Sequence, residues 1–229
     1  MKTVALIPAK GNSERLKDKN LLKIGNKSLV YSACEKCLNV CSIDRVYIDT
    51  ESDEIINDLL PLISKGLNVI RRPVEMASNS TSGNDLIVFE QSMIEKCDLI
   101  LHTYATSPFI TSNTIEKCIQ TFISKRFVPP EPTGSQEQYD SFFTALPVKE
   151  YFWYNGEPVN FDLNILPNSQ NLDTIWMETH GLYGITWDAL TKFKRRLGNR
   201  VLPIQIEDSE ALDINTPLDY KEAIKLYEE

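Results

Sequence analysis

Short β-rich runs alternate with amphipathic helical patterns through the first half of this 229-residue chain, and this alternation constrains the fold most. Four runs rich in β-branched and apolar side chains are typical of strands. They span residues 3–8, 45–49, 68–70 and 98–103. Four stretches with apolar residues at three- and four-residue spacing predict helices. They span residues 28–39, 52–65, 83–94 and 113–124. Because strand and helix alternate, we predict an α/β fold with a mostly parallel sheet flanked by helices.

The second half of the chain departs from this alternation twice. Residues 128–139 hold three Pro, one Gly and no periodicity, which predicts an exposed, mobile loop. Residues 142–154 are dense in aromatic and β-branched side chains and precede the turn signal Asn155-Gly156, so we predict an antiparallel excursion over about residues 141–171. Its aromatic side chains are typical of either a local core or a subunit interface.

The end of the chain returns to the α/β pattern. A strand is predicted at 182–185, a helix at 187–196 and a strand at 201–206. A final helix is predicted to begin with Thr216 as its N-cap and Pro217 at its first position. The length suits one domain over residues 1–229 that contains the excursion.

The charge distribution indicates which partners the chain can take. A formal net charge of −8 argues against a protein that binds the nucleic-acid backbone, because that requires a basic face. The first 36 residues are the exception, with eight basic and three acidic side chains. A basic amino-terminal segment in an acidic chain predicts a site for a small polyanion.

Cysteine usage and hydropathy predict the compartment. Five Cys cannot all pair within the chain, no segment resembles a secretory signal, and no run of 18 apolar residues predicts a membrane span. We therefore expect a cytoplasmic protein without a membrane partner. Cys34, Cys37 and Cys41 form a C-x2-C-x3-C run, but no His or fourth Cys lies at zinc-finger spacing, which favours three buried core residues over a zinc site.

The loop after the first predicted strand is the first candidate ligand site, because ligands bind at the carboxyl ends of parallel strands. Gly11 allows close backbone approach, Ser13 offers a hydroxyl, and Lys10 and Lys19 bracket the loop with positive charge. Such a loop can hold nucleotide phosphates. The G-x-G-x-x-G and G-x-x-x-x-G-K-[ST] patterns are absent, so a solvated lysine-rich loop is the alternative.

Five segments, in order along the chain, resemble the acylneuraminate cytidylyltransferase family, which activates sialic and related acidic sugars, and 3-deoxy-manno-octulosonate, as CMP-sugars. They read IPAKGNSERLKDKNLLKIGNKSLVYSA from residue 7, RPVEMA from 72, TSP from 106, ETHGLY from 178 and LDINTP from 212. The resemblance covers most of the chain apart from residues 128–139. It implies a Rossmann-like, GT-A-like nucleotidyltransferase fold.

The resemblance also implies an activity. A sugar hydroxyl attacks the α-phosphorus of CTP, pyrophosphate leaves, and CMP is joined to an acidic α-keto sugar such as a sialic-acid-like nonulosonate. CTP and an acidic sugar are therefore the expected partners, and a homodimer formed through the excursion is expected to help close the sugar pocket. Two alternatives stay open: a nucleotidyltransferase with a different sugar or base, and a catalytically impaired nucleotide-binding regulatory protein.

Residue roles are implied only where this sequence matches the family's segments. The expected catalytic residues are Lys10, Lys19, Arg72 and Asp213. The expected nucleotide contacts are Ala9, Gly11, Ser13, Asn20 and Ser82. The expected sugar contacts are Tyr104, Gln170, Glu178 and His180.

Structural roles remain open for several of these residues. Arg72 is alternatively a surface arginine beside a strand end, Ser82 a helix cap, and Asp213 a turn residue before the last helix. His102, in the predicted strand 98–103, is expected to be a buried imidazole rather than a sugar contact.

Magnesium is the expected metal, because triphosphate transfer needs charge neutralisation and oxygen ligands suit a hard cation. The family's D-I-D carboxylate pair corresponds to Asp213 and Asn215, so only one anion remains. Lys10 also stands where the family usually has Arg, which keeps the charge but loses the bidentate fork. Weaker metal binding and looser phosphate positioning are the expected consequences.

Overall fold

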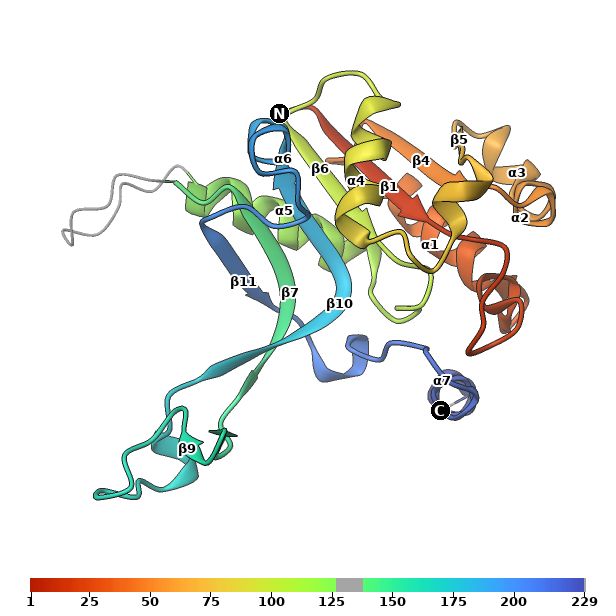
Figure 1. Ribbon diagram of the computed structural model, residues 1–229. Coiled ribbons are helices and arrows are strands. Elements are labelled where there is room, and N and C mark those ends of the chain that lie inside the picture. Colours follow the sequence, from red (N-terminus) through yellow and green to blue (C-terminus); the bar gives the residue numbers. More distant parts are fainter. Residues whose placement is uncertain (127–137, 229) are drawn as a thin grey trace.

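The computed structural model describes residues 1–126 and 138–228. A seven-stranded sheet in the order β11-β7-β10-β6-β1-β4-β5 forms its centre (Figure 1). Its strands are β1 (Thr3–Pro8), β4 (Arg45–Thr50), β5 (Asn68–Arg71), β6 (Leu99–Thr103), β7 (Ser141–Val148), β10 (Ile175–Thr186) and β11 (Val201–Gln205). β10 pairs antiparallel with β6 and β7, and the other pairings are parallel. The predicted mostly parallel α/β sheet is confirmed.

Helices cover both faces of this sheet (Figure 1). They are α1 (Leu29–Leu38), α2 (Asp53–Asp58), α3 (Leu60–Ile63), α4 (Gly83–Ser92), α5 (Ser112–Arg126), α6 (Trp187–Phe193) and α7 (Pro217–Glu228). Short 3-10 turns are η1 (Lys19–Leu21), η2 (Val74–Ala77), η3 (Ser169–Asn171) and η4 (Asp208–Glu210). Two small hairpins pair β2 (Lys23–Ile24) with β3 (Lys27–Ser28), and β8 (Trp153–Tyr154) with β9 (Glu157–Pro158).

The side chains of β1 show how the sheet divides two hydrophobic cores. Ala5 and Ile7 pack into the core shared with α1 and α5, whereas Val4 and Leu6 pack into the core shared with α4 and α6. Successive side chains of a strand point to opposite faces, so a strand buried on both faces is a continuous apolar run. That is why the TVALIP run predicts a central strand correctly.

Two local predictions are wrong, each for a backbone reason. The helix predicted over residues 52–65 is divided into α2 and α3. Pro61 lacks the N–H that would bond the Asn57 carbonyl, so one continuous helix cannot form there. Cys34 and Cys37 are buried as predicted, but Cys41 is exposed because α1 ends at Leu38 and helical spacing no longer applies beyond it.

The long strands β7 and β10 continue beyond the ends of the neighbouring strands, and the tip of the excursion lies at their far end (Figure 1). At its tip, the predicted Asn155-Gly156 turn joins β8 to β9, with φ of 50° at Asn155 and 85° at Gly156. Positive φ at both central residues suits a tight hairpin turn. The predicted mobile loop at 128–139 falls mainly on residues 128–137, which lie outside the described residues.

No helix in residues 1–126 or 138–228 is both long enough and apolar enough to cross a membrane. In the same ranges, no three His, Cys, Asp or Glu side chains cluster as a ready metal site.

Candidate active site

A cavity of about 560 Å³ opens at the carboxyl ends of the central strands, next to Pro8 at the end of β1 and Tyr104 directly after β6. Open α/β sheets bind ligands at this edge because the loops that follow parallel strands meet there. The cavity is lined by five cationic side chains and two carboxylates, which gives it an excess of positive charge. The cations are Lys10, Arg15, Lys19, Arg72 and Arg196, and the carboxylates are Glu14 and Asp213.

Nine of the residues predicted from the sequence line this cavity. They are Lys10, Ser13, Asn20, Lys19, Arg72, Tyr104, His180, Asp213 and Asn215. They come from loops after β1, β5 and β6, from a bulge in β10, and from the segment before α7. Residues as far apart in the chain as Lys10 and Asn215 therefore face one space.

The loop after β1 and the segment before α7 form one side of the cavity, and Figure 1 shows them close together. Lys10 donates a hydrogen bond to Asn79, and Asn20 donates to the Lys10 carbonyl at 2.9 Å, which shapes the loop. Lys19 is half-buried, and burial lowers its pKa, although the nearby Asp213 carboxylate opposes this effect. A cation with few water contacts is well suited to hold a phosphate.

Asp213 and Asn215 lie together at the position expected for a metal. The Asn215 Nδ2 donates to Asp213 Oδ2 at 2.6 Å, and Arg15 Nη2 donates to Asn215 Oδ1 at 3.1 Å. Asp213 Oδ1 is buried and has no hydrogen-bond donor among the described residues. A buried carboxylate oxygen without a donor fits a cation, so these residues suit a metal held jointly with substrate oxygens.

Arg72 is buried rather than a surface arginine. Its Nε and Nη2 donate to Asp49 Oδ2 at 2.9 and 2.6 Å, and Nη2 also donates to the Asp49 carbonyl at 3.1 Å. Because Asp49 is the second-last residue of β4 and Arg72 follows β5, the ion pair joins the ends of two neighbouring strands. This geometry fixes the guanidinium at the cavity wall.

Behind Arg72, a second carboxylate is buried against the first. Glu90 of α4 is in hydrogen-bond contact with Asp49, and burial raises the pKa of both carboxyl groups to about 7. Asp49 Oδ1 and both Glu90 oxygens find no N–H or O–H donor among the described residues. One proton shared between the two carboxyl groups satisfies this pair, because two adjacent buried carboxylates repel each other.

The predicted burial of the His102 imidazole is confirmed. Burial lowers its pKa to about 3, so the ring is neutral at pH 7. Its Nε2 lies 3.1 Å from Glu90 Oε2, in poor alignment for a hydrogen bond, and its Nδ1 lies 3.0 Å from the Tyr104 hydroxyl. The ring therefore connects the carboxyl pair to Tyr104 at the cavity floor.

Around Tyr104, the cavity is walled by Arg196 and β10. Arg196 Nη1 donates to the Tyr104 hydroxyl at 2.9 Å, and Nη2 lies 3.4 Å from Glu178 Oε1. The Tyr183 hydroxyl also donates to Glu178. A β-bulge between Glu178 and Tyr183 carries His180 in the left-handed conformation, with φ of 60°, and its side chain is exposed at the cavity.

Five of the predicted contacts do not line this cavity, and one of them, Glu178, lies beside it as a partner of Arg196. The Ala9 side chain is fully buried and its N–H donates to the Asp49 carbonyl, while the Gly11 N–H donates to Glu51. The Ser82 hydroxyl caps α4 in a capping box with Asp85, which confirms the helix-cap alternative. Gln170 lies in η3 of the excursion, where its side chain is exposed.

Some residues of the site were missed by sequence reasoning. Arg15 and Asn79 lie in or near segments of the family resemblance, but no motif singles them out. Arg196 belongs to a Lys-Arg-Arg run at 194–196 that is typical of a solvated helix end. Asp49 and Glu90 occur in a predicted strand and a predicted helix, and only their burial reveals that they belong together.

A mostly parallel sheet with a cation-lined cavity at its strand ends defines an α/β protein with a site for an anionic ligand. The chain belongs to the cytidylyltransferase family, since the family model described as Cytidylyltransferase matches residues 4–228. This confirms the family that the five sequence segments predict.

Known relatives agree with this assignment. A pseudaminic acid cytidylyltransferase of Campylobacter jejuni is 27% identical over 128 residues, covering 55% of this chain and 55% of the relative. An N-acylneuraminate cytidylyltransferase of Streptococcus agalactiae is 21% identical, covering 96% of this chain and 52% of the relative. These alignments span about half the length of both curated relatives.

A solved structure with the same fold is CMP:2-keto-3-deoxy-manno-octonic acid synthetase complexed with CTP. It superposes with a TM-score of 0.65 at 16% identity and covers 99% of this chain and 98% of its own. The likeness confirms the predicted nucleotidyltransferase fold.

Proposed function

We propose that this chain transfers CMP from CTP to an acidic α-keto sugar and releases pyrophosphate. The observation that carries the proposal is one cavity, lined by five cations and two carboxylates, at the strand ends of a cytidylyltransferase-family chain. An excess of positive charge suits a triphosphate and an anionic acceptor together. Relatives named for pseudaminic acid and N-acylneuraminate support an acidic sugar, and sialic acid is one candidate among several.

In the proposed reaction, a sugar hydroxyl forms a bond to the α-phosphorus of CTP, the bond to the pyrophosphate oxygen breaks, and the hydroxyl proton passes to solvent. Negative charge grows on the leaving pyrophosphate, and fixed cations stabilise that charge. The proposal gives this role to Lys10, Arg15 and Lys19, because they line the cavity on the side of the β1 loop. Arg72 would act as a fixed cation, held by its buried pair with Asp49.

We propose magnesium as the cofactor, held by Asp213 Oδ1 and the amide oxygen of Asn215 together with substrate oxygens. Magnesium sites in such enzymes commonly use one or two carboxylates plus phosphate oxygens, and the partnerless Asp213 Oδ1 supports this assignment. When bound, the ion would neutralise charge on the triphosphate. The Asn215 oxygen already accepts from Arg15, so the ion would use its second lone pair or replace that hydrogen bond.

A pyrophosphate-release screen tests the proposed function. CTP, UTP, GTP and ATP are each supplied with Mg²⁺ and N-acetylneuraminate, pseudaminate or 3-deoxy-manno-octulosonate. We expect release with CTP and at least one acid. Lys19→Met should reduce this release strongly, while Lys23→Met, an exposed lysine outside the cavity, should not. Release with another nucleotide in place of CTP would assign a different base.

One observation favours a second candidate, a nucleotide-binding regulatory protein. The site has Asn215 where a second carboxylate is expected, and the Asn215 oxygen is already bound by Arg15. Such a protein would raise its melting temperature with CTP and release no pyrophosphate with any acid in the screen.

We also propose, from the family resemblance, that two copies pair through the excursion. Several large apolar side chains there are exposed, more than an unpartnered surface usually carries. They include Trp153, Tyr154, Leu163, Ile165 and Leu166. Ile165→Asp should lower the molar mass measured by light scattering from dimer to monomer. Leu218→Asp, at an equally exposed leucine of α7, should leave the dimer intact.

A further inference from the structure

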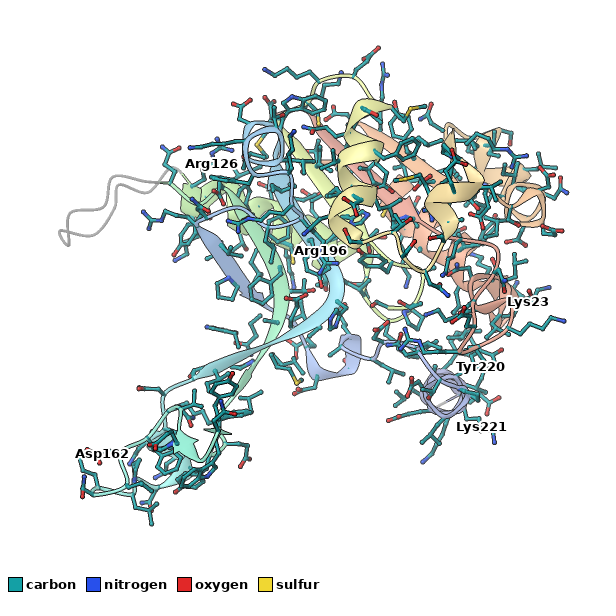
Figure 2. The ribbon with its side chains drawn as sticks, viewed as in Figure 1. Lys23, Arg126, Asp162, Arg196, Tyr220 and Lys221 are labelled. Carbon is teal, nitrogen blue, oxygen red and sulfur yellow. The ribbon has the colours of Figure 1, made fainter. Side chains whose placement is uncertain are left out.

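Arg196 is a cation of the cavity that lies outside all five segments of the family resemblance. It follows α6, yet its side chain lines the cavity. Figure 2 shows Arg196 beside β10. Only 25% of the side chain is exposed. An arginine at the end of a surface helix is normally solvated, so the partial burial of Arg196 at the cavity indicates a functional role.

Neighbouring groups hold Arg196 in one position. Its guanidinium carbon lies 3.7 Å from the centroid of the Tyr183 ring, which is stacking distance. The Arg196 Nη1 donates to the Tyr104 hydroxyl at 2.9 Å, and the backbone N–H donates to Asn84 Oδ1 at 2.9 Å. A cation fixed in this way loses little conformational freedom when it binds a ligand.

His102 fixes Tyr104 in turn. Because the Tyr104 oxygen accepts from Arg196, its proton can point to His102 Nδ1, 3.0 Å away. The ring of His102 is neutral and buried, so its Nδ1 can accept a hydrogen bond from the Tyr104 hydroxyl. Tyr104 and His102 are therefore positioning residues for Arg196.

The position of Arg196 separates it from the cations around the β1 loop. Its side-chain partners Tyr104, Tyr183 and Glu178 follow β6 or belong to β10, and β10 is two strands from β1 in the sheet. Neighbouring strands lie about 4.8 Å apart, which places β10 about 10 Å from β1. That distance is enough for the nucleotide phosphates and the acceptor to occupy different parts of one cavity.

Two of the five N–H donors of Arg196 face Tyr104 and Glu178, and the other three have no acceptor among the described residues. The Glu178 contact, at 3.4 Å, is made through a single oxygen that also accepts from Tyr183, so it neutralises Arg196 incompletely. A planar carboxylate is the ligand group that best matches a free guanidinium edge.

We infer that Arg196 binds the carboxylate of the acceptor sugar and thereby selects acidic over neutral sugars. This inference rests on the proposed function. It gives the acceptor a fixed orientation, with the carboxylate toward β10 and the reacting hydroxyl toward the β1 loop.

The test compares a sugar acid with its methyl ester, which lacks the charge. N-acetylneuraminate, 3-deoxy-manno-octulosonate and their methyl esters are assayed by pyrophosphate release with the unchanged protein, Arg196→Gln and Arg195→Gln. Arg195 is the matched control, because it is exposed and bonds Gly198 and Asn199 instead of lining the main cavity. We expect Arg196→Gln to raise the KM for the acid on the order of 10- to 100-fold, with the KM for CTP unchanged.

The ester provides the decisive readout. The unchanged protein and Arg195→Gln should prefer acid over ester, and Arg196→Gln should lose that preference, which general damage to the fold would not produce. Tyr104→Phe should raise the KM for the acid less, without abolishing the preference. If Arg196→Gln keeps the acid KM and the preference, or raises the KM for CTP instead, the inference is overturned while the proposed function stands. If the unchanged protein releases no pyrophosphate with any acid, the proposed function fails and the inference falls with it.

Discussion

Arg72 donates two hydrogen bonds to one carboxylate oxygen of Asp49, from Nε at 2.9 Å and from Nη2 at 2.6 Å, and both side chains are buried. The pair joins the ends of β4 and β5 at the wall of the cavity. This pair stabilises the fold and holds Arg72 at the cavity wall, because either partner alone would be an unpaired buried charge.

Asp49→Ala should destabilise the fold by about 3–5 kcal/mol, because it leaves the Arg72 guanidinium buried without its carboxylate. The free energy of unfolding from urea denaturation measures this effect. The matched control is Asp53→Ala, which removes the exposed pair of Asp53 with Arg71 and should cost about 1 kcal/mol or less. Equal losses of unfolding free energy in the two variants would show that the buried Arg72–Asp49 pair stabilises the fold no more than the exposed Arg71–Asp53 pair does.

Glu90→Gln should weaken the pH dependence of stability between about pH 4.5 and 7. Burial raises the pKa of Glu90 from 4.5 to about 7 and that of Asp49 from 3.8 to about 7, so the folded protein keeps a proton that the unfolded chain has lost. Stability therefore falls as the pH rises through this window. Glutamine imitates the protonated carboxyl and removes most of that loss.

The measurement for Glu90→Gln is the fall in melting temperature from pH 5 to pH 8, which should be smaller than in the unchanged protein by roughly 2 °C or more. Glu95→Gln serves as the control, because Glu95 is exposed and its lysine and arginine neighbours lower its pKa, out of this range. A fall in Glu90→Gln as steep as in the unchanged protein would argue against the shared proton.

Asp213→Ala should abolish pyrophosphate release while leaving the fold nearly intact. Asp213 Oδ1 has no hydrogen-bond donor to lose, so truncation removes few stabilising contacts but takes away the one carboxylate proposed to hold magnesium. Turnover and melting temperature are measured on the same sample. Unchanged turnover would reject the metal assignment, and Asp208→Ala in the nearby η4 should be neutral for both quantities.

Asn215→Asp should raise the affinity for magnesium. It would place a second carboxylate beside Asp213, at a contact that is now an amide hydrogen bond of 2.6 Å, and a divalent ion relieves the resulting repulsion. The half-saturating Mg²⁺ concentration should fall, and without Mg²⁺ the melting temperature should drop and recover when the ion is added. An unaltered Mg²⁺ dependence would count against Asn215 as a ligand.

Most secondary structure could be predicted because it depends on local patterns. The doubly buried TVALIP run, the capping residues Ser82 and Thr216, and the Asn155-Gly156 turn all act within a few residues. The predictions that failed were local too. Pro61 interrupts the predicted helix 52–65, and the end of α1 leaves Cys41 exposed.

The candidate site was predicted only where a motif marks it. Lys10, Lys19 and Asp213 stand in recognisable segments, and the fold brings them to one cavity. Arg196 and Glu90 carry no such mark, since a Lys-Arg-Arg run and a glutamate in a helix usually face solvent.

The order of strands and helices along the chain, the mostly parallel sheet and the family could all be predicted, because periodicity and motifs are properties of neighbouring residues. The contact of Glu90 with Asp49 and the stacking of Arg196 on Tyr183 became known only from the folded molecule. These contacts join residues that are distant in the chain, and their charge states depend on burial, which forms only when the whole sheet and its helices pack.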